Sequence, residues 1–336
     1  MIRFLKTLGT ALALAAILSP FAAAAGRTPG SVLIYPIYDS NPGSGTLISI
    51  TNTKNDPSFN PATNLNGVVD VHFIYIDGED WNEFNRYERL TPNDTFSVLA
   101  DTHDPNSDEG FLYCIAIDPI SFEPVSFNWL IGDEIVADSN GNWLFGVEAI
   151  SFKSLVAEGT ASDVNANGLI DLDGVEFEAV ADEMYISSFF GQGAYVTAPT
   201  PAPESTLVLL SLVGDSDYRT TIDFAVYNNN EQEFSATHKI RCWEKVKLED
   251  IDGVFSNFFL MNTNWDQTNN GYMLGTTGWA RLDGQVAVDI VGNQPALDNP
   301  PFVGLILQAL DGFAAGHLLH ESDAPNERGG VLDTLQ

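Results

Sequence analysis

Short strand-like runs constrain the fold of this 336-residue chain more than any other feature. They are rich in Val, Ile, Phe, Tyr and Thr, and turns of Gly, Pro, Asn and Asp separate them, as in antiparallel sheets. In the first part of the chain they are residues 32–38, 46–51, 68–76, 95–100, 110–117 and 124–131. Helical periodicity is nearly absent, and its best candidate is the stretch 175–184. Strands at this density predict an all-β fold of sandwiches or barrels.

The run 68–76 has apolar side chains on both faces. Phe73 and Tyr75 share one face, and Ile74 and Ile76 share the other, because successive strand residues point to opposite sides. A strand that is apolar on both faces is buried on both, so we predict a central strand here.

The second part of the chain repeats the order of elements in the first. The apolar run 32–38 has a counterpart at 207–213, and Gly110 and Pro124 have counterparts in Gly278 and Pro301. Residues 89–97 can also be laid beside 247–256 if one extra residue is allowed. These matches indicate an internal duplication, and two unrelated sandwiches that share generic strand and turn residues are the alternative. We predict two tandem β-sandwich modules of the immunoglobulin-like type.

A chain of this length usually forms two domains. Composition adds three further parts, at the two ends and between the domains. The stretch 198–204 contains three prolines and is typical of an extended spacer. The predicted parts are a signal peptide at 1–25, a first module at 26–154, a calcium-loop segment with the Pro-rich spacer at 155–204, a second module at 205–325 and a tail at 326–336.

The first 25 residues predict export. Arg3 and Lys6 precede an apolar run at 8–18, and small residues at Ala23 and Ala25 suit cleavage after Ala25, which together are typical of a secretory signal peptide. The apolar run is too short to span a bilayer, and we expect no membrane span elsewhere. The expected location is the periplasm, the exterior or the cell surface.

Charge and cysteine content narrow the choice of partners. A formal net charge of −32 repels nucleic acid and attracts divalent cations and basic partners, although it also serves solubility alone. Hydrophobic residues make up 44% of the chain, which excludes a disordered acidic tail. Cys114 and Cys242 can form a bridge or stay as buried thiols. We favour thiols, because the two cysteines occupy non-equivalent places in the two modules.

The stretch 163–176 is the one place where the sequence indicates a specific chemistry. Oxygen-bearing side chains stand at every second position, at Asp163, Asn165 and Asn167, and Gly168 and then Asp171 follow. A hard cation needs six to eight oxygens, so a short loop must curl and aim alternate side chains at one point. The spacing predicts a calcium site, and an ordinary surface turn rich in Asn, Asp and Gly is the alternative.

Leu169, Ile170 and one later acid complete the predicted calcium loop. Leu169 offers its backbone carbonyl, and Ile170 turns inward to anchor the loop to the core. The stretch resembles the calcium loops of dockerin and thrombospondin-type repeats over about a dozen residues. It departs from them at the twelfth position, where Gly174 replaces the expected acid, so that Asp173 or Glu176 must take its place.

A second resemblance, which covers most of the mature chain, implies where the protein is located but not what it does. The stretches 84–90, 173–178 and 241–244 resemble those of a group of secreted bacterial β-rich proteins without an assigned function. This resemblance implies an exported β protein over most of the mature chain.

Catalytic motifs do not appear. The sequence has no G-x-S-x-G, no P-loop and no dinucleotide fingerprint, and neither cysteine has a histidine nearby in sequence. Neighbouring acids such as Asp133 and Glu134 could serve a glycosidase, but a solvated turn or a local ion pair explains them better. We expect a protein that is not an enzyme.

Three tryptophans stand in polar surroundings, namely Trp81, Trp143 and Trp265. Each could stack on a sugar, or close one end of a sandwich core. We therefore predict an exported, non-enzymatic protein with a structural calcium ion, whose partner is a glycan or a cell-surface protein. A secreted glycan hydrolase on a β scaffold is the alternative.

Overall fold

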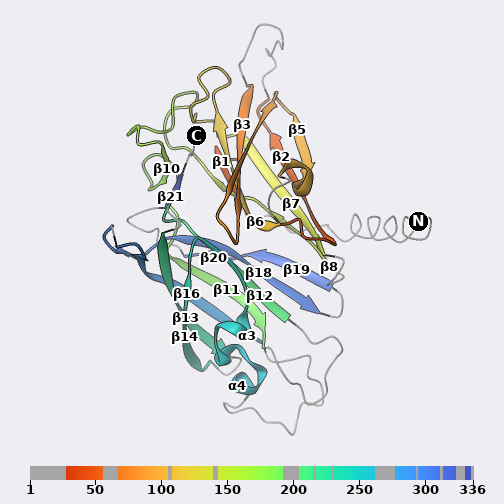
Figure 1. Ribbon diagram of the computed structural model, residues 1–336, viewed down its shortest axis with the longest axis vertical. Helices are drawn as coiled ribbons and strands as arrows, with labels where there is room; N and C mark the ends of the chain where they lie inside the picture. The colour runs from red at the N-terminus through yellow and green to blue at the C-terminus, as the bar shows by residue number, and fades with distance from the viewer. Residues whose placement is uncertain are drawn as a thin grey trace, which may run out of the picture.

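The computed structural model describes eleven segments of the chain: residues 28–55, 67–104, 108–138, 143–191, 204–214, 217–228, 231–261, 277–292, 294–310, 313–322 and 330–333. Their regular structure is dominated by β strands, and every strand pairing is antiparallel (Figure 1). The predicted all-β fold is therefore confirmed. No helix within these segments has the length and apolar character that a membrane crossing needs. The predicted signal peptide and nearly all of the Pro-rich spacer lie outside the described residues.

The first half of the chain forms two sheets. One has the order β4 (Glu83–Leu90), β3 (Val69–Asp77), β6 (Glu109–Ile117), β1 (Val32–Asp39) and β9 (Ile150–Phe152). The other has the order β5 (Thr95–Leu99), β2 (Ser44–Asn52), β7 (Leu130–Asp138) and β8 (Trp143–Glu148). A single helical turn, α2 (Ala100–His103), follows β5.

The second half forms two further sheets. One has the order β14 (Glu233–Ile240), β13 (Tyr218–Asn228), β16 (Thr277–Asp289), β11 (Glu183–Phe190) and β20 (His320–Glu321), with β17 (Leu297–Asp298) on β16. The other has the order β15 (Trp243–Lys247), β12 (Glu204–Ser211), β18 (Phe302–Leu310) and β19 (Phe313–Leu318). The helical turns α3 (Leu248–Ile251), η1 (Gly253–Phe255) and α4 (Asn257–Met261) follow β15.

Both halves have the same strand order and the same pairings. The correspondence runs from β1–β6 to β11–β16, from β7 and β8 to β18 and β19, and from β9 to β20. α2 likewise corresponds to α3. The second half therefore starts at β11, which lies inside the range 155–204 that the sequence assigns to the connecting segment. The matched runs 32–38 and 207–213 belong to β1 and β12, which are not corresponding strands.

A glycine at the same place in each half allows close pairing of its strands. The second residue of β6 is Gly110 and that of β16 is Gly278; a Cβ on either would lie within 2.6 Å of a carbonyl oxygen of the neighbouring strand. Each glycine is paired with the first strand of its half just past a β-bulge, Tyr38 with Gly110 and Phe189 with Gly278. Bulges and backbone approaches of this kind exclude side chains, so glycine is required at both places.

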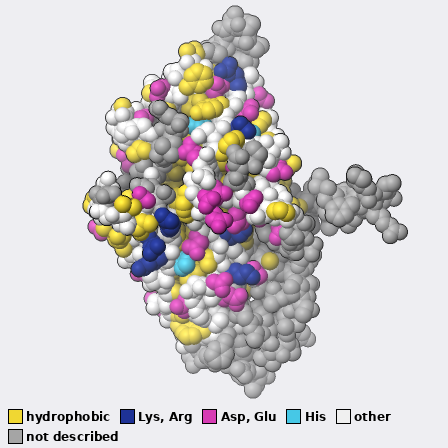
Figure 2. All heavy atoms as spheres, viewed as in Figure 1, with side chains coloured by type: hydrophobic (Ala, Val, Ile, Leu, Met, Phe, Trp, Pro, Cys, Tyr) yellow, Lys and Arg dark blue, Asp and Glu magenta, His cyan; other side chains and the backbone are white. Residues whose placement is uncertain are grey.

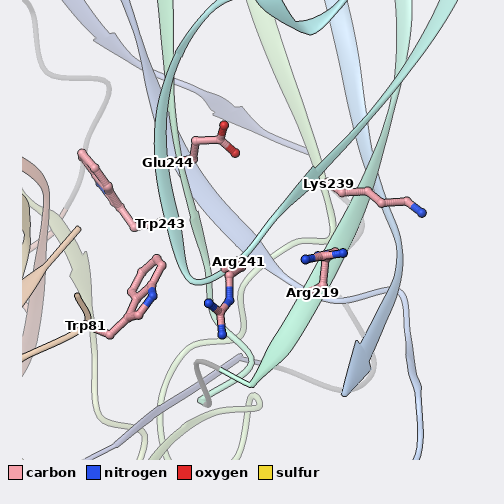
Figure 3. A pocket seen from close by; sticks show the side chains of 6 residues that line it. All are labelled: Trp81, Arg219, Lys239, Arg241, Trp243 and Glu244. Carbon is pink, nitrogen blue, oxygen red and sulfur yellow. The ribbon is translucent and has the colours of Figure 1, made fainter. Parts of the chain in front are cut away.

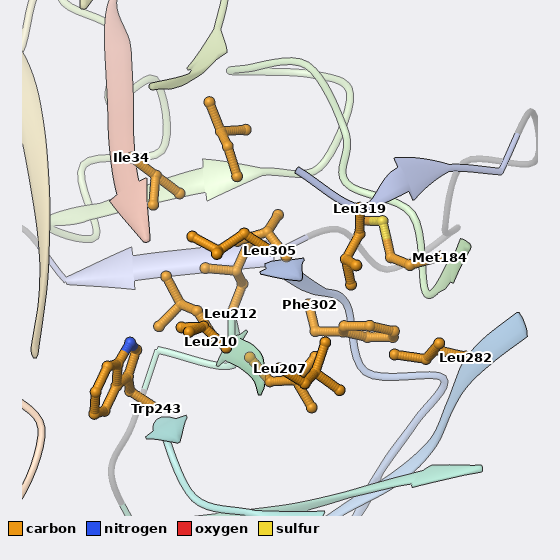
Figure 4. Packing of buried hydrophobic residues seen from close by; sticks show 14 of the residues in the cluster. Ile34, Met184, Leu207, Leu210, Leu212, Trp243, Leu282, Phe302, Leu305 and Leu319 are labelled. Carbon is orange, nitrogen blue, oxygen red and sulfur yellow. The ribbon is translucent and has the colours of Figure 1, made fainter. Parts of the chain in front are cut away.

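The sheet that contains β1 packs on apolar side chains at both of its faces. Leu33 and Tyr35 of β1 belong to the cluster inside the first half, whereas Ile34 belongs to a second cluster that continues into the second half. Figure 4 shows Ile34 above Leu305 and other apolar side chains of the second half. Strands β1, β3 and β6 are consequently buried on both faces, and the prediction of a central strand at 68–76 is confirmed.

One element outside these four sheets connects distant parts of the chain. The short strand β10 (Leu169–Leu172) pairs with β21 (Gly330–Asp333), close to the end of the chain (Figure 1). The helix predicted at 175–184 is wrong: residues 175–182 form turns and extended chain, and β11 starts at Glu183. The local reason is that Phe177 forms a β-bridge with Ser154, and the backbone on either side is hydrogen-bonded to residues 153–155, so these groups are not available for helical hydrogen bonds.

The two cysteines lie in different environments. Cys114 is buried in β6, where loss of water raises the pKa of its thiol well above the usual value. Cys242 lies partly buried between β14 and β15. Both are thiols in the structure.

Candidate functional site: the oxygen-lined loop before β10

The loop at residues 163–168 is anchored by the strand that follows it. Ile170 and Leu172 of β10 are fully buried, and Leu332 of β21 is buried beside them in the same apolar cluster. Ile170 therefore points inward, as the sequence predicts. The anchored strand holds one end of the loop in place.

The backbone of the loop curls at two residues. Ala166 and Gly168 have φ values of 56° and 77°, in the left-handed region that glycine adopts without strain. The carboxylate of Asp163 accepts hydrogen bonds from the N–H groups of Asn167, at 3.1 Å, and Gly168, at 2.9 Å. The predicted sharp turn at Gly168 is present.

Three predicted ligands meet at one carboxylate oxygen. The side-chain amides of Asn165 and Asn167 donate to Oδ2 of Asp171, at 2.8 and 3.0 Å. The N–H of Leu169 donates to Oδ1 of Asn167 at 2.8 Å. The fold thus brings Asp163, Asn165 and Asn167 of the loop together with Asp171 of β10, and Leu169 is the first residue of that strand.

Glu176 completes this cluster from the far side. Its Oε1 accepts the N–H groups of Val164, at 2.7 Å, and Asn165, at 3.1 Å. The side chain is only 2% exposed, and no described group donates to its Oε2. Burial is the main cause that raises its pKa, the two backbone donors lower it, and the charges of Asp171 and Asp163 raise it further.

Asp173 behaves differently from Glu176. Its Oδ1 accepts the N–H groups of Val175 and Glu176, at 2.8 and 3.0 Å, so it caps its own turn. The sequence leaves open which of the two acids replaces the missing twelfth-position ligand. The geometry favours Glu176, because its carboxylate is the one that reaches the loop.

The donor set is made of oxygen atoms alone. Carboxylates, amides and main-chain carbonyls suit hard cations such as Ca²⁺ and offer nothing to metals that prefer sulfur or imidazole. Across the described residues, no three His, Cys, Asp or Glu side chains are grouped closely enough to hold a metal by themselves. A cation in this loop would therefore depend on the oxygens of Asn165 and Asn167 as well as on the acids.

The three predicted sugar-stacking tryptophans are placed unequally. Trp81 lies partly buried in the turn between β3 and β4, with φ at 60° and the guanidinium of Arg241 5.9 Å from its ring centroid. Trp143 begins β8, but its side chain is not among the described atoms, and Trp265 lies outside the described residues. Trp81 alone can be judged as part of a binding surface.

Sequence reasoning missed the cations around Trp81. A signal for them exists, because five of the 14 Lys and Arg residues fall within residues 219–247 of an otherwise acidic chain. Arg219, Lys239 and Arg241 belong to this stretch and line one cavity with Trp81.

The acid pair at Asp133 and Glu134 is not a solvated turn. Both residues belong to β7, and adjacent strand residues point to opposite faces. Glu134 is fully buried, whereas Asp133 is on the exposed side. Two carboxylates arranged in this way do not face each other across a groove, as a glycosidase requires.

Comparison of the chain with models of protein families and with curated proteins finds no match. Functional conclusions therefore depend on the geometry of this chain.

Proposed function

We propose that the protein is an exported, non-enzymatic binding or structural protein outside the cytoplasm, in which one calcium ion stabilises the loop before β10. The observation that supports this most is the buried Glu176, whose Oε2 lacks a donor beside a loop lined with oxygens. A buried carboxylate oxygen without a partner costs free energy, and a cation at the loop would remove that cost.

Asp163, Asn165, Asn167, Asp171, Glu176 and the carbonyl of Leu169 would hold the ion. Half a turn about the last torsion of Asn165 or Asn167 exchanges its NH₂ group for its carbonyl oxygen. The two amides that now donate to Asp171 would then present oxygen toward the same point. Bound calcium would supply positive charge to the three carboxylates, which are not grouped closely enough in the structure to hold a metal by themselves.

The place of the loop suggests a structural role. It leads into β10, which pairs with β21 close to the end of the chain. Ordering the loop would fasten β21 and the segment between the two halves. The expected affinity is weak, with Kd about 10⁻⁴ to 10⁻³ M, because two ligands are neutral amides.

We also propose that the halves are two tandem β-sandwich modules of the immunoglobulin-like type that arose by duplication. The equal strand order and the matched pair Gly110 and Gly278 support this proposal. The scaffold would present loops and edges for binding, and the predicted partner remains a glycan or a cell-surface protein.

Calcium titration tests the metal site. With 1 mM Ca²⁺ and Kd about 10⁻⁴ M, binding should stabilise the fold by about 1.4 kcal/mol and raise Tm by about 3 °C. Hydrogen exchange of the amides in β21 should slow at the same time. Asp163→Ala and Glu176→Gln should each remove both responses.

Two control variants keep the test specific. Asp173→Asn should retain the calcium response, because Asp173 caps its own turn. Asp118→Ala removes a turn-capping carboxylate of the same kind from the first half, where Asp118 accepts N–H groups of Ile120 and Ser121. It should lower Tm equally with and without calcium. A wild-type protein without any calcium response in melting or calorimetry would refute the site.

A secreted glycan hydrolase remains the alternative function. Incubation with polysaccharides and detection of released reducing ends separates the two. Turnover would overturn the non-enzymatic proposal, whereas binding without release supports it.

A further inference from the structure

A cavity of about 380 Å³ opens where the two halves of the chain meet. It is lined by Trp81, Arg219, Lys239, Arg241, Trp243 and Glu244. Trp81 comes from the turn between β3 and β4 of the first half, and the other residues come from β13, β14 and β15 with the turn between them. Figure 3 shows the two indole rings on one side and Arg219 with Lys239 on the other.

The charge of this cavity is opposite to that of the molecule. The chain carries a net charge of −32, yet three of its 14 Lys and Arg residues gather here beside one acid, Glu244. On the face drawn in Figure 2, Asp and Glu side chains are spread over both halves, whereas Lys and Arg form a few small groups. A cationic cavity in such a protein selects small anions from solution.

Ion pairing inside the protein does not account for these cations. Within the described residues, Arg219 and Lys239 form no ion pair, and both are exposed. The carboxylate of Glu244 is hydrogen-bonded to Nε2 of His238 at 3.0 Å. Arg219 and Lys239 therefore line the cavity as exposed cations without an ion-pair partner among the described residues.

The aromatic wall is held in place before any ligand binds. Trp243 is 6% exposed and donates from Nε1 to the carbonyl of Pro36 at 2.8 Å. Its ring packs on Gly78, where an added Cβ would lie 2.4 Å from the ring. Lys245 of the same strand is ion-paired with Glu109 and Asp39 of the first half. Trp243 is thus a fixed, buried part of the wall, and Trp81 is the ring that stays partly exposed to a ligand.

We propose that this cavity binds an acidic saccharide, a sugar ring that carries a carboxylate. An indole face stacks on the apolar face of a sugar, and Arg and Lys hold a carboxylate through charge-assisted hydrogen bonds. A uronic acid carries one carboxylate on each sugar ring, so every negative charge that enters the repulsive field of the protein comes with an apolar ring face that can stack. The inference deepens the binding role proposed above and rests on it. It uses no residue of the calcium loop.

Isothermal titration with a trisaccharide of galacturonic acid tests the proposal, with neutral galactotriose and inorganic phosphate as comparisons. All titrations are run in EDTA and again in calcium, so that binding through a shared calcium ion is detected. The trigalacturonate should bind in both conditions, and added salt should weaken it. Galactotriose and phosphate should each bind at least about tenfold more weakly, because each has only part of the required chemistry.

Variants locate the binding. The double substitution Arg219→Gln with Lys239→Gln should weaken trigalacturonate binding by about tenfold or more without changing Tm, since both side chains are exposed. Trp81→Gly, which suits the positive φ of that residue, should abolish quenching of tryptophan fluorescence by the sugar. Lys247→Gln is the matched control: it removes one exposed positive charge outside the cavity and should leave binding unchanged.

Several outcomes would overturn the proposal. They are no binding of the trisaccharide at 10 mM, equal binding of the neutral sugar, unchanged binding by the double variant, or tighter binding of phosphate alone. Loss of binding in EDTA alone would place the sugar at a calcium ion instead of this cavity. A missing calcium response with intact trigalacturonate binding would refute the calcium site and leave the cavity standing.

Discussion

The two halves of the molecule use the same strand order with different interiors. In the first half, α2 ends at His103 and the fifth residue of β7 is Glu134, and both side chains are buried. At the corresponding places in the second half, α3 ends at Ile251 and the fifth residue of β18 is Ile306. The strand order therefore does not depend on the chemistry of these core positions, whereas the glycines of β6 and β16 are present in both halves.

The largest effect is expected at the shared glycines. Gly110→Ala places a Cβ 2.0 Å from the carbonyl oxygen of Ile76, and the backbone cannot yield without breaking the pairing of β3 with β6. We expect a loss of about 3 kcal/mol or more in the free energy of unfolding. Gly278→Ala should cost less, because its backbone obstacle, the carbonyl oxygen of Tyr227, lies farther from the added Cβ, at 2.6 Å.

Denaturant unfolding measures this difference, and Gly45→Ala is the control. Gly45 lies in β2 with nothing within 4 Å of an added Cβ, so the change should stay within about 0.5 kcal/mol. Equal stability of the Gly110 and Gly45 variants would contradict the inference that a side chain at Gly110 disturbs the pairing of β3 with β6.

His103 should make the first half sensitive to acid. Its Nδ1 lies 2.8 Å from the hydroxyl of Tyr75, and burial, together with the charge of Arg86, lowers its pKa from 6.5 to about 4. The unfolded chain then binds the proton first as the pH falls. Stability is lost from about pH 6.5 down to about pH 4, by about 3 kcal/mol in all.

The His103→Gln variant isolates this contribution. Glutamine keeps hydrogen-bonding groups near Tyr75 but does not titrate, so its free energy of unfolding should fall less between pH 7 and pH 4.5 than that of the wild type. Parallel curves for the two proteins would show that His103 does not carry the acid sensitivity.

Glu134 should have the opposite pH dependence. No described group donates to either of its oxygens, and burial raises the pKa of its carboxyl well above the usual value, with the charge of Asp133 adding to the effect. As the pH rises above about 4.5, the unfolded chain releases this proton first and the fold loses stability. Glu134→Ile, which copies Ile306 of the second half, should stabilise the protein by about 2 kcal/mol at pH 7.

The gain should shrink toward pH 4.5, because the unfolded wild-type chain then also holds this proton and the fold no longer loses stability through it. Denaturant unfolding at both values measures it. The reverse substitution, Ile306→Glu, is the matched control and should destabilise the second half. A destabilised Glu134→Ile variant at pH 7 would indicate that this carboxyl has a partner in solution.

The smallest effects are expected at exposed ion pairs. Lys54 and Glu158 lie 2.7 Å apart, and Lys247 and Glu204 lie 3.1 Å apart, with both acids more than 40% exposed. Removing either pair should cost less than about 1 kcal/mol. Glu158→Gln should cost more than Glu204→Gln, because Glu158 also accepts the indole N–H of Trp129 at 3.1 Å.

The lowered pKa of Glu158 allows the contribution of its ion pair to be checked by changing the pH. The hydrogen bond from Lys54 lowers it, so this contribution is present above about pH 4.5 and is lost as the pH falls through the lowered value. Thermal melting at pH 7 and pH 3.5 measures the difference between the two variants. An equal response of the two pairs would mean that Trp129 adds nothing.

Much of the candidate calcium site could be predicted from the sequence. The alternation of Asp163, Asn165 and Asn167 before Gly168 is a local pattern, and a short loop can form its geometry from neighbouring residues. The choice between Asp173 and Glu176 was not local. It depended on which carboxylate the buried chain around Phe177 turns back to the loop.

The sequence by itself determined the all-β class, the central strand at 68–76 and the curl at Gly168, because strand alternation and turn chemistry act between near neighbours. Only the tertiary structure decided that the second half begins at β11, that Glu134 is buried and that Trp81 meets Arg241 and Trp243. These facts depend on contacts between residues far apart in the chain, such as Trp243 with Pro36. Packing between sheets sets such contacts, and no short stretch of sequence specifies them.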